Sequence, residues 1–313
     1  MTKHAHTEDS TRIALVLGSG GFRGPAHIGV LSRLKELRVP VHAMVGCSVG
    51  SLITAYHAAV GMPVEDLLEY AFRTDALGVL SHALSMRLGS RGGRFLERWE
   101  RPVLRRLELL DRSDFRRLHH GVQKVGFLSY DQRRGERIFA VTGQERGFTL
   151  SEAVRASCRL PVLFPPLRKE VDGLERRLVD GALSAPSPVI HAVAAPISAT
   201  HVIVVDLTGS RRRARGSELG RWQRLLGDRL VVLRPRAGIH LGLWGDSRSA
   251  RAWYEAGRQG IGPSEAQRMR AWLGAEAAPE TPRTMEGGRP RVPPAPVTRV
   301  GLGDSDDEAM PRR

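Results

Sequence analysis

Two short apolar runs, each followed by a helix-like stretch, open this chain and constrain its fold more than any other feature. Residues 13–17 form an apolar run that ends in glycines, and residues 25–37 then repeat apolar side chains at helical spacing. The pattern recurs at once, with residues 41–45 as a second strand and residues 49–60 as a second helix closed by Gly61. This order of strands and helices predicts a layered α/β fold built on a parallel sheet.

The remaining length predicts one folded domain flanked by two tails. A chain of 313 residues can bury a large core, and strand-like and helix-like segments alternate through residues 11–273. Residues 1–10 are polar and indicate a flexible tail. Residues 274–313 are rich in Pro, Gly, Glu and Arg and indicate a disordered one. An arginine-rich stretch at residues 209–237 is expected as an insertion within the domain.

The charge of the chain favours an anionic partner. Lys and Arg number 48 against 33 Asp and Glu, which gives a formal net charge of +15. Residues 209–237 alone hold nine arginines and two acidic residues. We therefore expect peripheral contact with an anionic membrane through this stretch, with nucleic acid as the less favoured partner. A solvated basic surface without a specific partner explains the composition equally well.

Cysteine usage and hydropathy predict a protein of the cytoplasm. The two cysteines, Cys47 and Cys158, are too few for a disulfide framework. The polar N-terminus has no apolar signal segment, and no uninterrupted apolar run approaches the ~20 residues that span a bilayer. We expect a soluble cytoplasmic protein, with a peripheral position on the inner membrane face as the alternative.

Ser48 lies in the pattern Gly-x-Ser-x-Gly, directly after the second predicted strand and before the second predicted helix. This is the order of a nucleophile elbow, in which a strand delivers a serine to a tight turn at a helix N-terminus. Gly46 and Gly50 would remove Cβ clashes in that turn. Because the pattern alone is common, the prediction depends on what surrounds it.

A glycine-rich turn at residues 18–24 joins the first predicted strand to the first predicted helix. It does not fit a dinucleotide fingerprint, because Arg23 stands where the third glycine is required, and it lacks the Gly-Lys-Ser/Thr end of a P-loop. Successive backbone N–H groups at a helix N-terminus can still hold developing negative charge, such as the oxyanion of acyl transfer. Arg23 would add a positive charge beside that site. A plain strand-to-helix turn is the simpler alternative.

A serine nucleophile needs a base, and the chain offers two kinds of candidate. His191, His201 and His240 lie late in the chain, where the histidine of a Ser-His-Asp triad would be, but no motif surrounds any of them. Asp180 ends a short apolar run, and the small residues after it would leave its carboxylate open to a partner. An aspartate within hydrogen-bond reach and shielded from water can take a serine proton directly. An Asp-Gly pair after a strand is also a common turn.

Taken together, the motifs resemble those of the patatin-like phospholipase family. Members of that family carry Gly-Gly-x-Arg/Lys-Gly, then Gly-x-Ser-x-Gly, then Asp-Gly-Gly/Ala. The matching stretches here are Gly20-Gly21-Phe22-Arg23-Gly24, Gly46-Cys47-Ser48-Val49-Gly50 and Asp180-Gly181-Ala182. The similarity covers roughly residues 12–205 and looks closest to the bacterial branch akin to the neuropathy-target-esterase catalytic domain. Ser19, Cys47 and Val49 depart from the residues that the family usually has there.

The resemblance implies a three-layer α/β/α fold with a mainly parallel central sheet. It implies that Ser48 is the nucleophile of a Ser-Asp dyad, that Asp180 is its base, and that Gly46 and Gly50 shape the elbow. Backbone N–H groups of the glycine-rich loop would form an oxyanion hole, whose expected members are Gly20, Gly21, Phe22, Arg23 and Gly24. No metal or cofactor is implied.

The implied substrate is a phospholipid, a lysophospholipid or another acyl ester, hydrolysed through an acyl-serine intermediate as part of lipid metabolism. Two alternatives stay open. One is a non-catalytic protein of the same fold that binds anionic lipid or nucleic acid, which the net charge of +15 favours. The other is an esterase with a Ser-His-Asp triad. The sequence does not constrain the oligomeric state.

Overall fold

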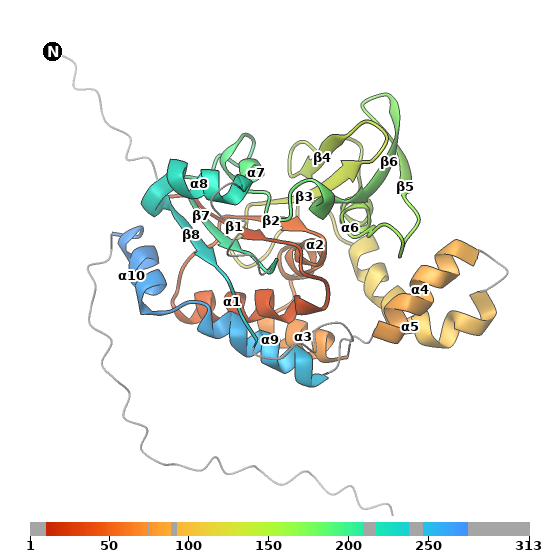
Figure 1. The fold of residues 1–313 in the computed structure, drawn as a ribbon, viewed down its shortest axis with the longest axis horizontal. Coiled ribbons are helices and arrows are strands. Elements are labelled where there is room, and N and C mark those ends of the chain that lie inside the picture. Colours follow the sequence, from red (N-terminus) through yellow and green to blue (C-terminus); the bar gives the residue numbers. More distant parts are fainter. Residues whose placement is uncertain (1–10, 74–75, 89–92, 209–216, 238–246, 275–313) are drawn as a thin grey trace, which may run out of the picture. The chain divides into compact units, whose positions relative to one another are not determined.

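An eight-stranded sheet between two layers of helices forms the fold (Figure 1). The computed structural model describes residues 11–73, 76–88, 93–208, 217–237 and 247–274. The tails predicted at residues 1–10 and 274–313 lie outside these ranges, apart from Gly274. The predicted three-layer α/β architecture with a mainly parallel sheet is confirmed.

The sheet has a parallel part and an antiparallel part. Its order is β5-β6-β3-β2-β1-β7-β8, and β4 pairs with β3 outside this path. The strands β3, β2, β1, β7 and β8 run parallel, whereas β4, β6 and β5 pair antiparallel with their neighbours. The strands are β1 (Ile13–Leu17), β2 (Ala43–Cys47), β3 (Lys124–Asp131), β4 (Glu136–Val141), β5 (Leu167–Val171), β6 (Leu174–Asp180), β7 (His201–Val205) and β8 (Leu230–Leu233). Parallel strands place their carboxyl ends at one edge, where open α/β sheets bind their ligands.

Helices cover both faces of the sheet. Figure 1 shows α7 and α8 on one face and α1, α3 and α9 on the other, with α4 and α5 forming a hairpin beside the antiparallel part. The helices are α1 (Pro25–Glu36), α2 (Val49–Thr54), α3 (Val64–Phe72), α4 (Ala76–Leu88), α5 (Gly93–Asp111), α6 (Leu150–Ser157), α7 (Ile190–Val193), α8 (Glu218–Leu226), α9 (Ser247–Gln259) and α10 (Pro263–Ala271). Within the described ranges, no helix combines the length and the hydropathy that crossing a membrane requires.

The side chains of β1 point alternately to the two faces of the sheet, which explains why helices cover both faces. Leu15 belongs to a buried cluster with Ile28 of α1, whereas the next residue, Val16, belongs to a second cluster with Ala192 of α7. Successive strand residues point to opposite faces, so a strand that is apolar throughout needs helices on both sides. Every residue of β1 is fully buried, which confirms the buried strand predicted at residues 13–17.

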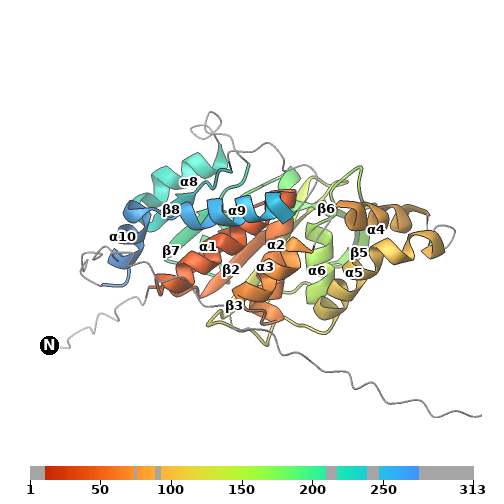
Figure 2. The same cartoon turned by 90° about the horizontal axis from the view of Figure 1, so that it is seen from below.

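Helix α9 returns late in the chain to lie along α1 (Figure 2). A Cβ at Gly29 would fall on the backbone oxygen of Tyr254, and one at Gly257 would fall on that of Ala26. These two glycines let the helix axes approach closely.

Two strands of the sheet are not evident from the sequence. β5 carries three charged residues in the sequence Leu-Arg-Lys-Glu-Val, so it shows no apolar run. β8 has four residues and lies within the arginine-rich stretch at residues 209–237. Residues 209–216 of that stretch lie outside the described ranges. The rest includes α8 and β8, and β8 pairs with β7 at the edge of the sheet.

Candidate active site

Strands β2 and β6 bring Ser48 and Asp180 together. Both pair with the same edge of β3, since β4 occupies the other edge. Cys47 lies opposite Leu128, and Asp180 lies opposite Ser129. Because β2 runs parallel and β6 antiparallel to β3, their carboxyl ends meet beside two consecutive residues of that strand. Ser48, directly after β2, thereby faces the last residue of β6.

The backbone at Ser48 adopts a conformation that L-residues normally avoid. Its φ of +56° and ψ of −127° correspond to a strain of about 1–3 kcal/mol. A Cβ at Gly46 would lie 2.5 Å from the Cα of Ser51, and one at Gly50 would fall on the backbone oxygen of Leu17. The two glycines therefore allow the chain to turn sharply here, and α2 begins directly after the serine.

Two residues at the end of α6 hold the Ser48 backbone in place. The N–H of Ser48 donates to the Oγ of Ser157 at 3.0 Å, and the Sγ of Cys158 donates to the Ser48 carbonyl oxygen at 3.1 Å. Ser157 is buried and also accepts a hydrogen bond from the Ser51 hydroxyl at 2.8 Å. The strained turn is thus fixed on both sides of the serine. Sequence reasoning missed these residues, because only tertiary packing brings the end of α6 to the elbow.

Both cysteines carry protonated thiols. Burial raises the pKa of Cys47 and of Cys158 well above the ordinary value, and the nearby Asp180 carboxylate raises both further. A protonated thiol can donate a hydrogen bond but is a poor nucleophile. Cys158 therefore supports the Ser48 backbone and does not compete with the serine hydroxyl.

Asp180 is buried, whereas Ser48 is partly exposed. Its carboxylate accepts hydrogen bonds from the Ser48 hydroxyl and from the Ala182 N–H, the latter at 2.8 Å. Its own N–H donates to the Arg159 carbonyl oxygen at 2.9 Å. Burial raises the pKa of Asp180, and the hydrogen bonds from Ser48 and Ala182 offset part of that rise. The carboxyl thus has a higher proton affinity than an exposed aspartate.

The glycine-rich loop follows β1, the strand next to β2, and so lies beside the elbow. A Cβ at Gly24 would lie 2.5 Å from the Val49 side chain, so the loop packs directly on the start of α2. The N–H groups of Arg23 and Gly24 donate to the carbonyl oxygens of Gly20 and Gly21, both at 3.1 Å. Two of the five expected oxyanion donors are therefore engaged within the loop itself.

The other three N–H groups of this loop are available. Among the described residues, no hydrogen-bond acceptor faces the N–H of Gly20, Gly21 or Phe22. Gly21 is exposed and has a φ of +55°, a conformation that favours glycine. Backbone donors that lack a protein partner at a helix N-terminus can bind an anion.

Arg23 and His27 anchor the glycine-rich loop. The Arg23 guanidinium donates to the Leu207 carbonyl oxygen at 2.7 Å and lies 5.6 Å from the ring centre of Trp253. The Nε2 of buried His27 lies 2.8 Å from the Gly18 carbonyl oxygen. Burial lowers the pKa of His27 to about 4, so its neutral ring donates that bond. The arginine expected as a charge beside the anion site therefore also fixes the position of the loop.

Neither of the two described triad candidates is hydrogen-bonded to the paired serine and aspartate. His201 begins β7, at the end of the parallel strands opposite to Ser48. His191 stacks on Phe139 with ring centres 4.2 Å apart, and burial lowers its pKa to about 4. His240 lies outside the described residues. The hydrogen-bonded partner of the serine hydroxyl is the aspartate.

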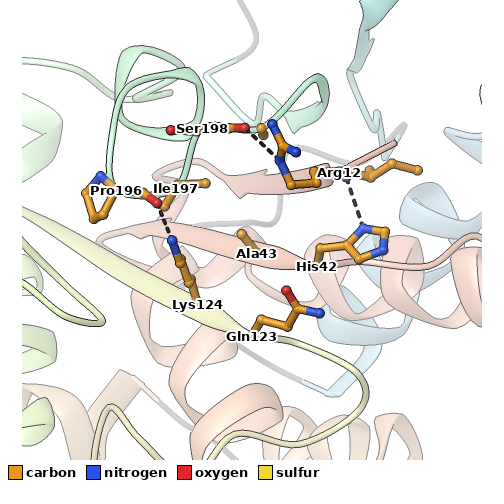
Figure 3. Close-up of a pocket in the computed structure, with 10 residues that line it drawn as sticks. Arg12, His42, Ala43, Gln123, Lys124, Pro196, Ile197 and Ser198 are labelled. Atoms are coloured by element: carbon orange, nitrogen blue, oxygen red, sulfur yellow. Dashed lines mark hydrogen bonds between the residues drawn. The ribbon is translucent and has the colours of Figure 1, made fainter. Parts of the chain in front are cut away.

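A cavity of about 270 Å³ lies at the amino ends of the parallel strands (Figure 3). Arg12, His42 and Lys124 line it, at or just before the starts of the strands. Lys124 donates to the Pro196 carbonyl oxygen, and the Nε of Arg12 donates to that of Ser198 at 3.2 Å. These cations hold a surface loop against the sheet. The cavity is separated from the serine by the length of the strands.

The described part of the arginine-rich stretch carries both paired and exposed side chains. Arg234 lies 3.4 Å from the carboxylate of Asp206, whereas Arg221 and Arg229 are exposed. Contact between this stretch and an anionic membrane stays a prediction.

Comparison with known proteins identifies the family. The family model described as patatin-like phospholipase matches residues 15–193. This range includes the glycine-rich loop, the elbow and Asp180.

Similar proteins match part of the chain. An uncharacterized NTE family protein of Mycobacterium tuberculosis is 29% identical over 205 residues, which cover 64% of this chain and 50% of that protein. The chain thus spans about half the length of this relative. Lysophospholipase NTE1 of Cryptococcus neoformans is 48% identical over 63 residues, 20% of this chain and 4% of that protein. Among solved structures, VipD from Legionella pneumophila aligns with a TM-score of 0.45 and 13% identity, over 80% of this chain and 67% of that one.

Proposed function

This chain belongs to the patatin-like phospholipase family, and from that premise we propose that it is a serine acyl hydrolase acting on phospholipid, lysophospholipid or another acyl ester. In this proposal Ser48 is the nucleophile of a Ser-Asp dyad and Asp180 is its base. The hydrogen bond from the Ser48 hydroxyl to the Asp180 carboxylate is the observation that carries the proposal.

In the first step the Ser48 oxygen attacks the carbonyl carbon of the ester while its proton passes to the Asp180 carboxylate. The carbonyl oxygen becomes an oxyanion, for which the open N–H groups of Gly20, Gly21 and Phe22 are the proposed donors. The tetrahedral intermediate then breaks the bond to the leaving oxygen. Asp180 returns the proton to that oxygen, and an alcohol or lysolipid departs from an acyl-serine.

In the second step water takes the place of the alcohol. Asp180 removes a proton from the water, whose oxygen attacks the acyl carbon, and the carboxyl then protonates the Ser48 oxygen as the fatty acid leaves. One carboxyl group thus serves as base and acid in turn, by microscopic reversibility.

The environment of Asp180 supports this role. An ordinary aspartate is too weak a base to take a serine proton readily, and a base is most effective when its pKa lies nearer the working pH. Burial moves the pKa of Asp180 in that direction, and the Ser48 hydroxyl is hydrogen-bonded to the carboxylate that would take its proton. No described histidine is in hydrogen-bond contact with either residue, which favours the dyad over a triad.

The proposed substrate class follows from the family and from one similar protein, a lysophospholipase. Lysophosphatidylcholine and phosphatidylcholine are therefore the first lipids to test. The basic surface of the chain, with its net charge of +15, also supports substrates presented on an anionic surface.

Turnover of p-nitrophenyl esters of increasing chain length tests the chemistry directly. We expect Ser48→Ala and Asp180→Asn to lose activity and His191→Ala to retain it. A fluorophosphonate probe should label the wild type at Ser48 and leave Ser48→Ala unlabelled. The neighbouring variant Ser51→Ala controls for nonspecific loss at the elbow and should still be labelled.

The outcomes separate the candidates. Loss of activity in a folded histidine variant would replace the dyad by a triad. No turnover and no labelling of the wild type, together with salt-dependent binding to anionic lipid or DNA, would support a non-catalytic binding protein instead.

A further inference from the structure

Helix α4 exposes a row of leucines to solvent. Leu77, Leu80, Leu84 and Leu88 follow one another at intervals of three or four residues, so they share one side of the helix. Their exposed fractions are 49%, 42%, 45% and 49%. A single exposed leucine is ordinary, but a continuous row of them marks a surface that binds something apolar. We call these four side chains the leucine face.

Beside the leucine face, α4 carries small and polar residues that contacts with α5 fix inward. Ser81 is buried, the Ser85 hydroxyl donates to the Glu100 carboxylate at 3.2 Å, and His82 lies 3.5 Å from the same carboxylate. Glu100 is itself buried on α5. A rotation of α4 that hid the leucines would break these polar contacts. The outward direction of the leucine face is therefore built into the hairpin.

Arg87 and Arg159 join α4 to the loop at residues 159–164. The Nε of Arg87 donates to the Leu163 carbonyl oxygen at 3.1 Å, and its other guanidinium nitrogen donates to the Val162 carbonyl oxygen. Arg159 donates to the Sδ of Met86 at 2.9 Å. These contacts tie the end of the leucine face to the loop.

The same loop leads directly to the candidate active site. Cys158 bonds to the Ser48 carbonyl oxygen at 3.1 Å, and the Asp180 N–H bonds to the Arg159 carbonyl oxygen at 2.9 Å. Leu160 and Val162, whose exposed fractions are 49% and 90%, lie in this loop between Arg159 and Leu163, the residue whose carbonyl oxygen Arg87 of α4 binds. The apolar surface thus extends from α4 toward the serine.

The loop holds one of these apolar side chains in solvent at a conformational cost. Val162 has a φ of +72°, a region that β-branched residues rarely occupy. The hydrogen bonds from Arg87 to both carbonyl oxygens of this turn stabilise it. Strain that is kept at an exposed apolar residue points to a binding role for that residue.

We propose that the leucine face and the loop at residues 159–164 dock on a lipid surface and present the candidate active site to it. The proposal rests on the proposed function, because it supplies the surface from which an acyl hydrolase would take its substrate. The charged side chains of α4 and of the loop are Arg87 and Arg159, with no Asp or Glu in either segment. An apolar face edged by arginines matches the acyl chains and phosphate groups of a phospholipid layer.

Two other occupants fit less well. A second copy of the chain would bring another net charge of +15 to the same place, which opposes association. The segment at residues 275–313 is rich in Pro, Gly and charged residues and contains no aromatic residue and a single leucine. It offers little apolar surface with which to cover four leucines.

Flotation of the full chain with phosphatidylcholine vesicles that contain phosphatidylglycerol tests the proposal. The double variant Leu80→Gln/Leu84→Gln should bind these vesicles about tenfold more weakly. Leu225→Gln is the matched control, because Leu225 is a single leucine, 68% exposed on α8, and its replacement keeps every arginine through which the arginine-rich stretch is expected to attract anionic lipid. It should bind like the wild type. Hydrolysis of a soluble p-nitrophenyl ester should be unchanged in both variants, while hydrolysis of vesicle lipid should fall in the double variant only.

A second measurement covers the possibility that the double variant folds poorly. In Leu84→Trp, brominated phosphatidylcholine in the vesicles should quench tryptophan fluorescence more strongly than in Leu225→Trp. Equal quenching in the two variants would overturn the proposal.

Three further results would overturn it. One is unchanged vesicle binding by a folded double variant, and another is equal loss of binding in Leu225→Gln. The third is a wild-type dimer, seen by sedimentation velocity, that the double variant abolishes. Failure of the proposed function is a separate result, since a chain that hydrolyses neither ester nor lipid can still be scored for binding.

Discussion

The hydroxyl oxygen of Ser157 accepts the backbone N–H of Ser48 at 3.0 Å. This bond fixes the peptide plane that leads into the strained residue, while Cys158 fixes the plane that follows it. The Ser48 side chain needs no structural partner of its own and its hydroxyl bonds to Asp180. The backbone N–H and carbonyl oxygen of Ser48 thus hold the residue in position, and its hydroxyl is left for the proposed chemistry.

Ser157→Ala should separate these two contributions. The variant leaves the Ser48 N–H and the Ser51 hydroxyl without their acceptor, at a cost of about 1–3 kcal/mol in the free energy of unfolding. A serine displaced by a fraction of an ångström should also lower kcat by about 10- to 100-fold. Thermal unfolding and ester turnover measure the two effects.

Ser151→Ala is the matched control for that variant, since Ser151 is a buried serine of the same helix whose hydroxyl accepts from Arg155. It should lower stability without a comparable fall in kcat. Equal falls in kcat for the two variants would refute a positioning role for Ser157.

The left-handed backbone at Ser48 predicts an unusual order of stabilities. Ser48→Gly should be more stable than Ser48→Ala by about 1 kcal/mol, because only glycine adopts a φ of +56° without strain. Both variants should be inactive. Chemical denaturation compares them, and an alanine variant as stable as the glycine variant would show that the turn is relaxed.

The raised pKa of Asp180 predicts the pH dependence of activity. The proposed base works as a carboxylate, so kcat/KM should fall as the pH drops through the pKa of this residue. Because burial raises that pKa, the acid limb should lie above the range of an exposed aspartate. Asp180→Asn should lower kcat by about 10²- to 10⁴-fold. An acid limb at the position expected for an exposed aspartate would contradict this assignment.

The same shift predicts how stability changes with pH. The folded chain binds the Asp180 proton more tightly than the unfolded chain, so protonation stabilises the fold. This contribution is present below the ordinary pKa of aspartate and is lost as the pH rises through the raised one. At neutral pH, Asp180→Asn should therefore unfold at the same or a higher temperature than the wild type. A marked loss of stability in this variant would mean that the carboxylate has a structural role.

Replacing Arg23 by lysine, which keeps the positive charge, should still lower activity. Lysine cannot reproduce both the bond to the Leu207 carbonyl oxygen and the stacking on Trp253. Arg23→Lys should therefore lower kcat by about tenfold, as Arg23→Gln should, because the glycine-rich loop loses its anchor. Arg33→Lys, on the exposed side of α1, should leave kcat unchanged. Full activity in Arg23→Lys with loss in Arg23→Gln would show that charge alone matters.

Local patterns were sufficient to predict the first two strands of the parallel part of the sheet and the serine turn. The strand predicted at residues 13–17 is apolar throughout because it is buried on both faces, and this is the pattern that a sequence shows most clearly. The strand predicted at residues 41–45 is displaced by two residues, since β2 spans Ala43–Cys47, and it too is buried throughout. The helix predicted at residues 49–60 is α2 continued by a π-helical turn over Ala55–Ala59. The glycines of the elbow were predictable because close approach to other backbone atoms admits no other residue.

Other features depend on contacts that no local pattern encodes. β5 exposes alternate charged residues at the edge of the sheet, so it lacks the apolar run of a buried strand. Ser157 and Cys158 reach the elbow only through the packing of α6 on the sheet. The side chain of Arg23 could be predicted as a charge, but its bond to a carbonyl oxygen after β7 depends on the order of the strands.

The carboxyl ends of β2 and β6 meet beside β3, and this arrangement limits which parts of the chain can change in evolution without moving the site. The spacing of Ser48 and Asp180 is set by two adjacent residues of one strand, Leu128 and Ser129. Insertions or deletions in the hairpin of α4 and α5, which lies between β2 and β3 in the sequence, leave that spacing unaltered. The surface that we propose to dock on lipid can therefore diverge in length and composition while the paired serine and aspartate keep their geometry.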